Sequence, residues 1–331
     1  MTGSEGLHLP AAPATGHTGE SFTSTRRDHH HHHHYHRPSS PMPCQRHKRE
    51  SASSLWRDAW HRLRRNRAAV GGAAFLVVLI LAAVAAPLLT SYAPDEADLA
   101  LTLKPASRTH PLGTDEMGRD IVARLLYGAR VSLTVGLVVQ TTSMIIGALL
   151  GLASGYFGGL VDGILMRLVD IMYAFPGFLF AVLMVAVLEP SMLTIILVLS
   201  LVGWPLPARL IRGEVLSLRE REYVHAARVV GASSWRIMIR HVLPNTLSVL
   251  IVQFTLGIAA VIMTEASLSF LGIGIQPPDP TWGGMIAKGR QFFRTYPYLA
   301  LYPSALLGIT VLAFNFLGDG LRDALDPRLR R

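Results

Sequence analysis

Six long apolar segments, separated by shorter polar stretches, constrain this sequence more than any other feature. Each is close to the roughly 20 residues that a helix needs to cross the hydrocarbon core of a bilayer. Membrane-spanning β-strands would be about half as long and would alternate in polarity, so helices are the remaining choice. The segments are residues 68–89, 131–155, 171–188, 191–208, 246–272 and 298–317. The sequence therefore predicts an all-α polytopic membrane protein with six transmembrane helices.

The distribution of charge supports a bilayer as the solvent. Only 16% of the 331 residues are charged, against about a quarter in soluble domains. A cytoplasmic N-terminus would place 20 lysines and arginines inside and 8 outside. Because basic residues favour the cytoplasmic side, we expect a multi-pass protein of the cell (cytoplasmic) membrane with both termini in the cytoplasm. The basic residues flank the spans, so the net charge of +9 does not indicate nucleic-acid binding.

The polar N-terminal region, residues 1–50, is predicted to be a disordered cytoplasmic tail. It is rich in Gly, Pro, Ser, Thr and His, so it buries too little apolar surface to fold. Six consecutive histidines, His29 to His34, are compatible with a metal-binding tract, an engineered tag or a native low-complexity segment. We predict no metal site, because a flexible run lacks the closed geometry of a dedicated one. The single cysteine, Cys44, excludes a disulfide within the chain.

Residues 51–67 predict an amphipathic helix in the membrane interface. Aromatic and apolar side chains share one face at helical spacing, namely Leu55, Trp56, Ala59, Trp60 and Leu63. The other face carries Arg57, Arg62, Arg64 and Arg65. Tryptophan anchors beside arginines are typical of helices that lie on a bilayer. An ordinary surface helix is the alternative, and the adjoining apolar span favours the interfacial one.

A polar segment, residues 209–245, separates the fourth span from the fifth and is too long for a simple turn. Its composition is compatible with a helix that ends at Gly231, after which Ser233 and Ser234 can cap a second short helix. Two short helices joined by a glycine bend indicate a structured cytoplasmic excursion that docks onto another protein.

Residues 222–245 read EYVHAARVVGASSWRIMIRHVLPN and resemble the cytoplasmic "EAA" loop of ABC importer permeases. The matching positions are Ala226, Ala227, Gly231, Leu243 and Pro244, whereas His225 stands for the motif's glutamate and His241 for its isoleucine. In that family the loop forms a coupling helix that sits in a cleft of a cytoplasmic ATPase. The resemblance implies that these residues, with His225, form the ATPase-coupling site. A glycine permits the turn, and a proline is expected to end the excursion.

Further matches extend over most of the chain after residue 51. HPLGTDEMGRD at 110–120, TEASLSFLGIGIQPPDPTWGGM at 264–285 and NFLGDGLRDALDPRLR at 315–330 resemble the C-type subunits of dipeptide, oligopeptide and nickel permeases. The resemblance implies a type I ABC importer permease fold over residues 68–331. It also implies a homologous second permease, two ATPase subunits that bind ATP and Mg, an extracytoplasmic substrate-binding protein, and a di- or oligopeptide cargo. A nickel or metal-chelate cargo is the alternative. The sequence has no G-x4-G-K-[ST] phosphate loop, so we expect a non-catalytic subunit without a cofactor of its own.

Three residues are candidates for the transport pathway or its gate. Glu265 is a carboxylate near the outer end of the fifth span, where an ionisable group indicates function by default; an interfacial carboxylate paired with an arginine is the alternative. Trp282, in the outer loop after this span, is expected to contact the binding protein or to belong to an aromatic belt at the membrane surface. Pro176 is either a hinge or a static kink. A stand-alone secondary transporter is a less favoured reading, since it predicts carboxylates at the membrane centre.

Overall fold

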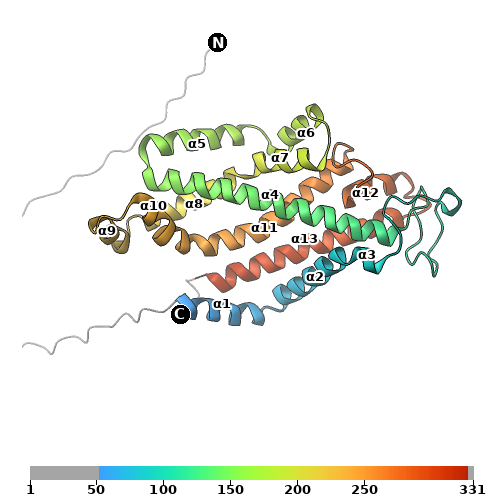
Figure 1. Ribbon diagram of the computed structural model, residues 1–331, viewed down its shortest axis with the longest axis horizontal. Coiled ribbons are helices and arrows are strands. Elements are labelled where there is room, and N and C mark those ends of the chain that lie inside the picture. The colour runs from blue at the N-terminus through green and yellow to red at the C-terminus, as the bar shows by residue number, and fades with distance from the viewer. Residues whose placement is uncertain (1–51, 327–331) are drawn as a thin grey trace, which may run out of the picture. The chain divides into compact units, whose positions relative to one another are not determined.

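The computed structural model describes residues 52–326, and every regular element among these residues is a helix. The predicted tail, the histidine tract, Cys44 and residues 327–331 lie outside the described residues. Five helical segments are long and apolar enough to cross a membrane, and a bent pair of helices makes a sixth if it is counted as one span. The predicted fold class is therefore confirmed. With the bent pair counted as one span, residues 52–326 pass along the bundle six times, and α1, α9, α10 and the end of α13 lie toward one end, whereas α12 lies at the other (Figure 1).

The first and last passes agree with the predicted spans, with shifted ends. The amphipathic segment is α1 (Ala52–Arg65), and the first pass is α2 (Arg67–Val84) followed by the short α3 (Ala86–Leu89). Asn66 separates α1 from α2 because its side-chain oxygen accepts a hydrogen bond from the amide of Ala69 at 3.1 Å, which caps the start of α2. The sixth pass, α13 (Tyr298–Leu325), continues beyond the predicted residue 317.

The second pass, α4 (Ile121–Phe157), begins well before the predicted residue 131. Its start is set by Asp120, whose carboxylate accepts a hydrogen bond from the amide of Ala123 at 2.8 Å. Arg124 and Arg130 lie in residues 121–130, the helical turns that precede the predicted span. The hydropathy of the sequence did not assign these turns to the span because of their charged side chains. The helix nevertheless continues, because an N-cap and helical neighbours determine where a helix begins, whereas hydropathy determines only which part of it is apolar.

The predicted third span, residues 171–188, is wrong as a single helix. Residues 159–174 form α5 (Gly159–Ala174), α6 (Gly177–Val187) follows, and the two are bent by 80°. Pro176 causes the break because a proline disfavours the helical conformation in the residue before it, and Phe175 has the extended angles φ −99 and ψ 136. Residues 156–170, expected to form an inner connection, are thus largely helical.

The fourth and fifth passes also extend into the predicted polar loop. The fourth is α7 (Met192–Gly203) joined to α8 (Pro205–Leu218), so the predicted end at residue 208 falls inside α8. Pro205 is tolerated because it occupies the first turn of α8, where its missing amide hydrogen is not needed. The fifth is α11 (Leu243–Phe270). The connecting elements are α9 (Glu222–Val229), α10 (Ser234–Ile237) and the π-helical turn Met238–Val242.

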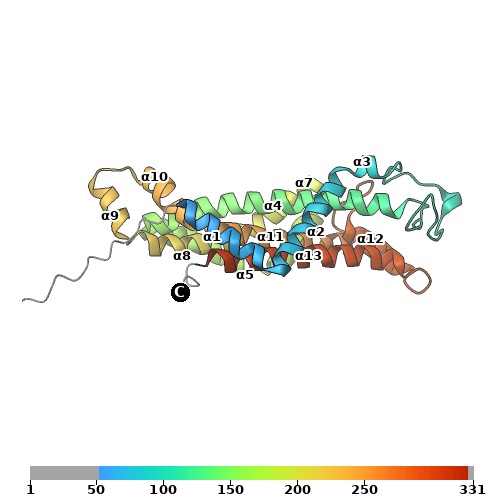
Figure 2. The same cartoon turned by 90° about the horizontal axis from the view of Figure 1, so that it is seen from below.

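The bundle is held together by close approaches of α4 to its neighbours. Gly147, Gly151 and Gly155 recur every fourth residue on one face of α4, where α8 packs against them. A Cβ at Gly151 would lie 2.6 Å from the carbonyl oxygen of Ala208, so only glycine fits. Small residues at this spacing let helix backbones approach closely in membranes. On the opposite side of the bundle, α13 packs between α11 and α2 (Figures 1 and 2).

Candidate coupling site and outer-end cluster

The predicted coupling segment forms two short helices joined at Gly231. This glycine has φ 84, a conformation that disfavours side chains, and its amide donates to the carbonyl of Arg228 at 2.9 Å. The amide of Ala232 donates to the carbonyl of Ala227 at 3.0 Å, which completes a helix C-cap. Ser233 then caps α10 by accepting from the amide of Arg236 at 3.3 Å. The glycine bend and the serine cap expected from the sequence are both present.

Pro244 lies at the start of the fifth pass, as expected, but the helical structure does not break before it. Leu243 and Pro244 lie in the first turn of α11, which follows α10 through the π-helical turn without a break in helical structure. The amide of Leu243 donates to the carbonyl of Met238, five residues back. A π-turn provides a local rearrangement that accommodates a residue unable to donate, so the coupling segment and the fifth pass form one helical unit.

One face of the coupling segment is anchored in the bundle. Val224, Ile237 and Val242 are buried in an apolar cluster whose other buried members are Leu152, Tyr156, Ile211, Val215 and Met238. These residues come from α4 and α8 as well as from the coupling segment. The guanidinium of Arg228 lies 5.2 Å from the ring centre of Tyr156, within cation–π range. Ala227 packs against the cluster, whereas Ala226 is exposed.

The exposed side of the coupling segment carries three large apolar side chains. Val229 and Val230 are each 87% exposed, and Trp235 is 63% exposed. Leaving these side chains in water is unfavourable, and an exposed apolar patch on a rigid element is typical of a binding surface. His225 is also exposed, and its Nε2 atom lies 3.8 Å from a carboxylate oxygen of Glu220.

A group of hydrogen bonds next to this segment connects three helices, and the sequence analysis missed it. Asp162 of α5 accepts a hydrogen bond from Arg212 of α8 at 2.7 Å and another from the hydroxyl of Ser154 of α4. Arg219 also donates to the carbonyl of Gly155 at 3.1 Å. The glycine spacing in α4 is a sequence signal that could have indicated this contact, because small residues at that spacing favour a close helix neighbour.

At the other end of the bundle, Glu265 is fully buried between two hydroxyl groups. Ser269 donates to one carboxylate oxygen at 2.7 Å, and Ser132 of α4 lies 3.4 Å from the other. Among the described residues no arginine forms an ion pair with Glu265, so the alternative of an arginine-paired interfacial carboxylate is wrong. Glu265 instead joins α11 to α4.

Trp282 is also fully buried, so it belongs neither to an exposed aromatic belt nor to a contact surface. It begins α12 (Trp282–Gln291), and its indole nitrogen donates to the carbonyl of Leu125 at 3.2 Å. Gly128 makes room for the ring, since a Cβ there would lie 3.2 Å from the indole Cδ1 atom. Trp282 and Glu265 therefore fasten α12 and α11 to the same end of α4. Pro176 lies apart from them, at the bend between α5 and α6.

Two sequence families match this chain. The model of the binding-protein-dependent transport system inner membrane component matches residues 147–331, and that of the N-terminal TM domain of oligopeptide transport permease C matches residues 54–106. The chain belongs to the family of binding-protein-dependent transport system inner membrane components. The first match includes the coupling segment, Glu265, Trp282 and Pro176.

Individual relatives of this permease are similar over nearly their whole length. The dipeptide transport system permease protein DppC of Alkalihalophilus pseudofirmus is 43% identical over 92% of this chain and 99% of its own length. The glutathione permease GsiD of Pectobacterium atrosepticum is 42% identical over 85% and 94%, and the oligopeptide permease OppC of Bacillus subtilis is 40% identical over 84% and 91%. A solved inward-facing structure of the MetNI methionine ABC transporter has 20% identity and a TM-score of 0.49 over 61% of this chain and 96% of that chain. The two family models and the 40–43% identical permeases confirm the resemblance to C-type peptide permeases, and the chain is a permease subunit of an importer of this family.

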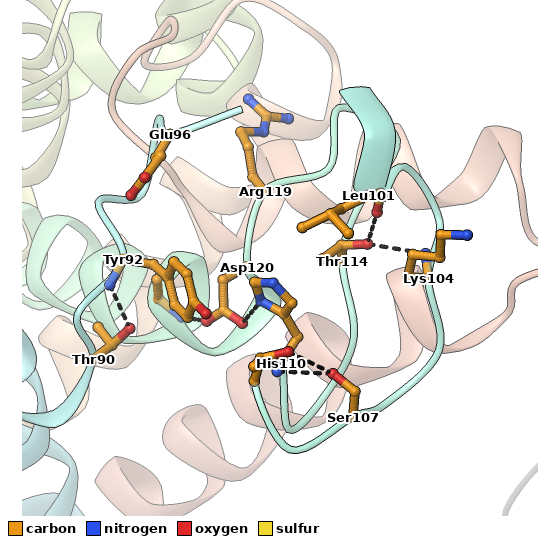
Figure 3. A network of polar contacts seen from close by, with 12 residues as sticks. Thr90, Tyr92, Glu96, Leu101, Lys104, Ser107, His110, Thr114, Arg119 and Asp120 are labelled. Atoms are coloured by element: carbon orange, nitrogen blue, oxygen red, sulfur yellow. Dashed lines mark hydrogen bonds and ion pairs between the residues drawn. The ribbon is translucent and has the colours of Figure 1, made fainter. Parts of the chain in front are cut away.

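The permease also contains an ordered polar network in the connection before α4, a segment that the sequence analysis used only as a family marker. Within HPLGTDEMGRD, the imidazole Nδ1 of His110 lies 2.9 Å from the carboxylate of Asp120, which also caps α4 (Figure 3). Asp115 binds the guanidinium of Arg119 at 2.8 Å and lies 3.3 Å from that of Arg124. These buried pairs fix the connection to the start of the helix that carries Leu125 and Ser132.

Proposed function

We propose that this chain is one of two homologous permease subunits in an ATP-driven importer that carries di- or oligopeptides across the cell membrane. An extracytoplasmic binding protein delivers the peptide, and two separate ATPase subunits bind ATP and Mg. The names of the similar permeases, which refer to dipeptide, oligopeptide and glutathione transport, support a peptide cargo. Membership of this family also argues against a stand-alone secondary transporter.

The orientation follows from charge and topology together. The basic residues favour a cytoplasmic N-terminus, and six passes return the chain to the side where it started. We place α1, the coupling segment and the end of α13 in the cytoplasm, and α12 and the connection before α4 outside. Both termini are then cytoplasmic.

The observation that carries the coupling role is the two-faced construction of residues 222–245. One face is buried against α4 and α8, while the other exposes Val229, Val230 and Trp235. An ATPase cleft that covers the exposed face can move the whole segment, and the buried face passes this movement to the spans. We assign His225, Ala226, Ala227, Gly231, Leu243 and Pro244 to this coupling site.

Val230→Asp tests the coupling surface. A carboxylate buried without a partner in an apolar cleft costs ~3 kcal/mol, which is a loss of more than 100-fold in affinity. The ATPase subunits should then fail to co-purify, and peptide-stimulated ATP hydrolysis should be lost. The matched control is Leu99→Asp, which changes a residue that is 76% exposed in the outer connection. Normal ATPase retention in Val230→Asp would contradict the docking role.

The transport function itself is tested by purification of the chain with its co-expressed partners. We expect a second permease, two ATPase subunits and ATP hydrolysis that peptide-loaded binding protein stimulates. Recovery of a stable homodimer that transports without ATP would overturn the proposal. Stimulation by a nickel chelate and not by peptides would assign the alternative cargo.

A further inference from the structure

Helix α1 carries three stripes of different chemistry. At 3.6 residues per turn, Ala59 and Leu63 share the face toward α13, where Ala59 is buried and Leu63 Cδ1 would lie 3.3 Å from a Cβ added to Gly320. Trp56 and Trp60 form a neighbouring stripe and are 49% and 59% exposed. A third stripe, next to the tryptophans, consists of exposed basic side chains, namely Arg57, His61, Arg64 and Arg65.

Basic side chains outnumber acidic ones on α1, and Asp323 of α13 is the acidic residue that lines the groove between the two helices. Asp58 is the single acidic residue in the α1 sequence, against four arginines. Arg57, Arg64 and Arg65 form no ion pair with any described carboxylate. Basic side chains of α1 line two open grooves. One, of about 530 Å³, is lined by His61, Arg62, Arg64 and Arg65; the other, of about 460 Å³, lies where α1 meets α13 and is lined by Arg62, Arg65, Asn66, Gly320, Asp323 and Ala324.

We propose that this face of α1 binds the phosphate headgroups of anionic membrane lipids. The two exposed tryptophans place the helix at the level of the headgroups, where indole rings partition. A bilayer of zwitterionic lipids would accommodate the tryptophan rings, but it would offer no excess of negative charge to the arginine stripe. Guanidinium groups bind phosphate oxygens in a bidentate manner, so arginines beside tryptophans favour phosphatidylglycerol or a similar lipid over a zwitterionic one.

Lipid bound here acts on the transmembrane bundle as well as on α1. Gly320 of α13 touches both Leu63 of α1 and Ala69 of α2, and Asn66 fixes the turn between these two helices. A lipid that binds α1 and the α1–α13 groove therefore stabilises the packing of the first and last passes. Because a ligand that binds only the folded state raises its stability, anionic lipid should raise the unfolding temperature of the assembled transporter.

The test compares lipid binding by the assembled transporter and by two variants. The complex is titrated with phosphatidylglycerol or phosphatidylcholine, and bound lipid is counted by native mass spectrometry, with thermal unfolding as a second measurement. We expect wild type to prefer phosphatidylglycerol, and Arg64→Gln with Arg65→Gln to weaken that preference by about five-fold for each arginine removed. The control, Lys104→Gln with Arg108→Gln, removes two exposed charges from the outer connection and should leave the preference unchanged.

Three outcomes would overturn the inference. The first is an unchanged lipid preference in the Arg64 and Arg65 variant, and the second is an equal loss in the control. The third is equal stabilisation by soluble glycerol phosphate at the same phosphate concentration, because the site would then bind free phosphate and not a membrane surface. Lipid preference is measured on complexes in which the ATPases are retained, without any readout of ATP hydrolysis, so a failure here leaves the coupling proposal intact.

Discussion

Replacement of Gly151 by alanine should separate the permease's two central helices. The added Cβ would lie 2.6 Å from the carbonyl oxygen of Ala208 and 3.0 Å from the Cβ of Ile211. Both neighbours belong to α8, and a backbone carbonyl cannot rotate out of the way. The helices must therefore move apart by several tenths of an ångström. Overpacking of this kind costs about 1–3 kcal/mol.

Gly213→Ala is the matched control, because it makes the same chemical change in α8 itself. Nothing lies within 4 Å of a Cβ at Gly213, and this residue is exposed. Alanine is a better helix former than glycine by about 0.8–1.0 kcal/mol, so Gly213→Ala should stabilise the protein slightly. The two variants are thus expected to change stability in opposite directions.

Thermal unfolding of the purified transporter measures both changes. At about 2–4 °C per kcal/mol for a domain of this size, Gly151→Ala should lower the unfolding temperature by roughly 2–12 °C, and Gly213→Ala should leave it unchanged or raise it. Because α8 leads into the coupling segment, Gly151→Ala should also lower peptide-stimulated ATP hydrolysis. Equal shifts in the two variants would refute the argument that the glycine stripe sets the distance between α4 and α8.

Substitutions at three further residues test the outer-end cluster and the departure from the coupling motif. Trp282→Phe removes the hydrogen bond to Leu125 and part of the ring, so it should destabilise the permease by about 1–2 kcal/mol in the same thermal assay; an unchanged unfolding temperature would contradict this. Glu265→Gln keeps a hydrogen-bonding atom for each serine, because its oxygen can accept from one hydroxyl and its NH2 can donate to the other, so it should preserve stability. Glu265→Ala should cost about 2–4 kcal/mol. Unchanged peptide uptake by Glu265→Gln would exclude a gating role for its charge. His225→Glu restores the motif's acid beside Glu220 at an exposed site, where like-charge repulsion costs less than about 1 kcal/mol. Peptide-stimulated ATP hydrolysis should therefore be retained. Its loss would show that the imidazole is required.

Hydropathy identified the passes of this chain but not their ends. The apolar run at 131–155 predicted a helix correctly, yet α4 starts at Ile121 because Asp120 caps it. A cap acts through one hydrogen bond and is invisible to an average over many side chains. Pro176 shows the same limitation, because it was recognised as a possible kink and its effect on Phe175 follows from local sterics, but the 80° bend depends on how α5 and α6 pack.

The coupling segment was the most predictable part of the candidate site. Its bend and cap arise from Gly231 and Ser233 themselves, which act on atoms within a few residues, so the sequence alone was sufficient. Glu265 and Trp282 were less predictable, because their partners Ser132 and Leu125 are 133 and 157 residues away in the sequence. Pairing over such separations depends on the arrangement of the helices, which local patterns do not encode.

The arrangement of contacts makes α4 the element through which the two ends of the permease are connected. At 1.5 Å per residue, its 37 residues extend over about 55 Å. One end carries Leu152 and Tyr156, which bury the coupling segment, and the other carries Leu125 and Ser132, which hold Trp282 and Glu265. In the proposed mechanism, a displacement of the coupling segment by an ATPase would act directly on α4, and this helix would pass it to the outer cluster. Because Gly151 is next to Leu152 and faces Ile211 of the same cluster, a change that loosens α4 from α8 should weaken transmission at the coupling end of α4.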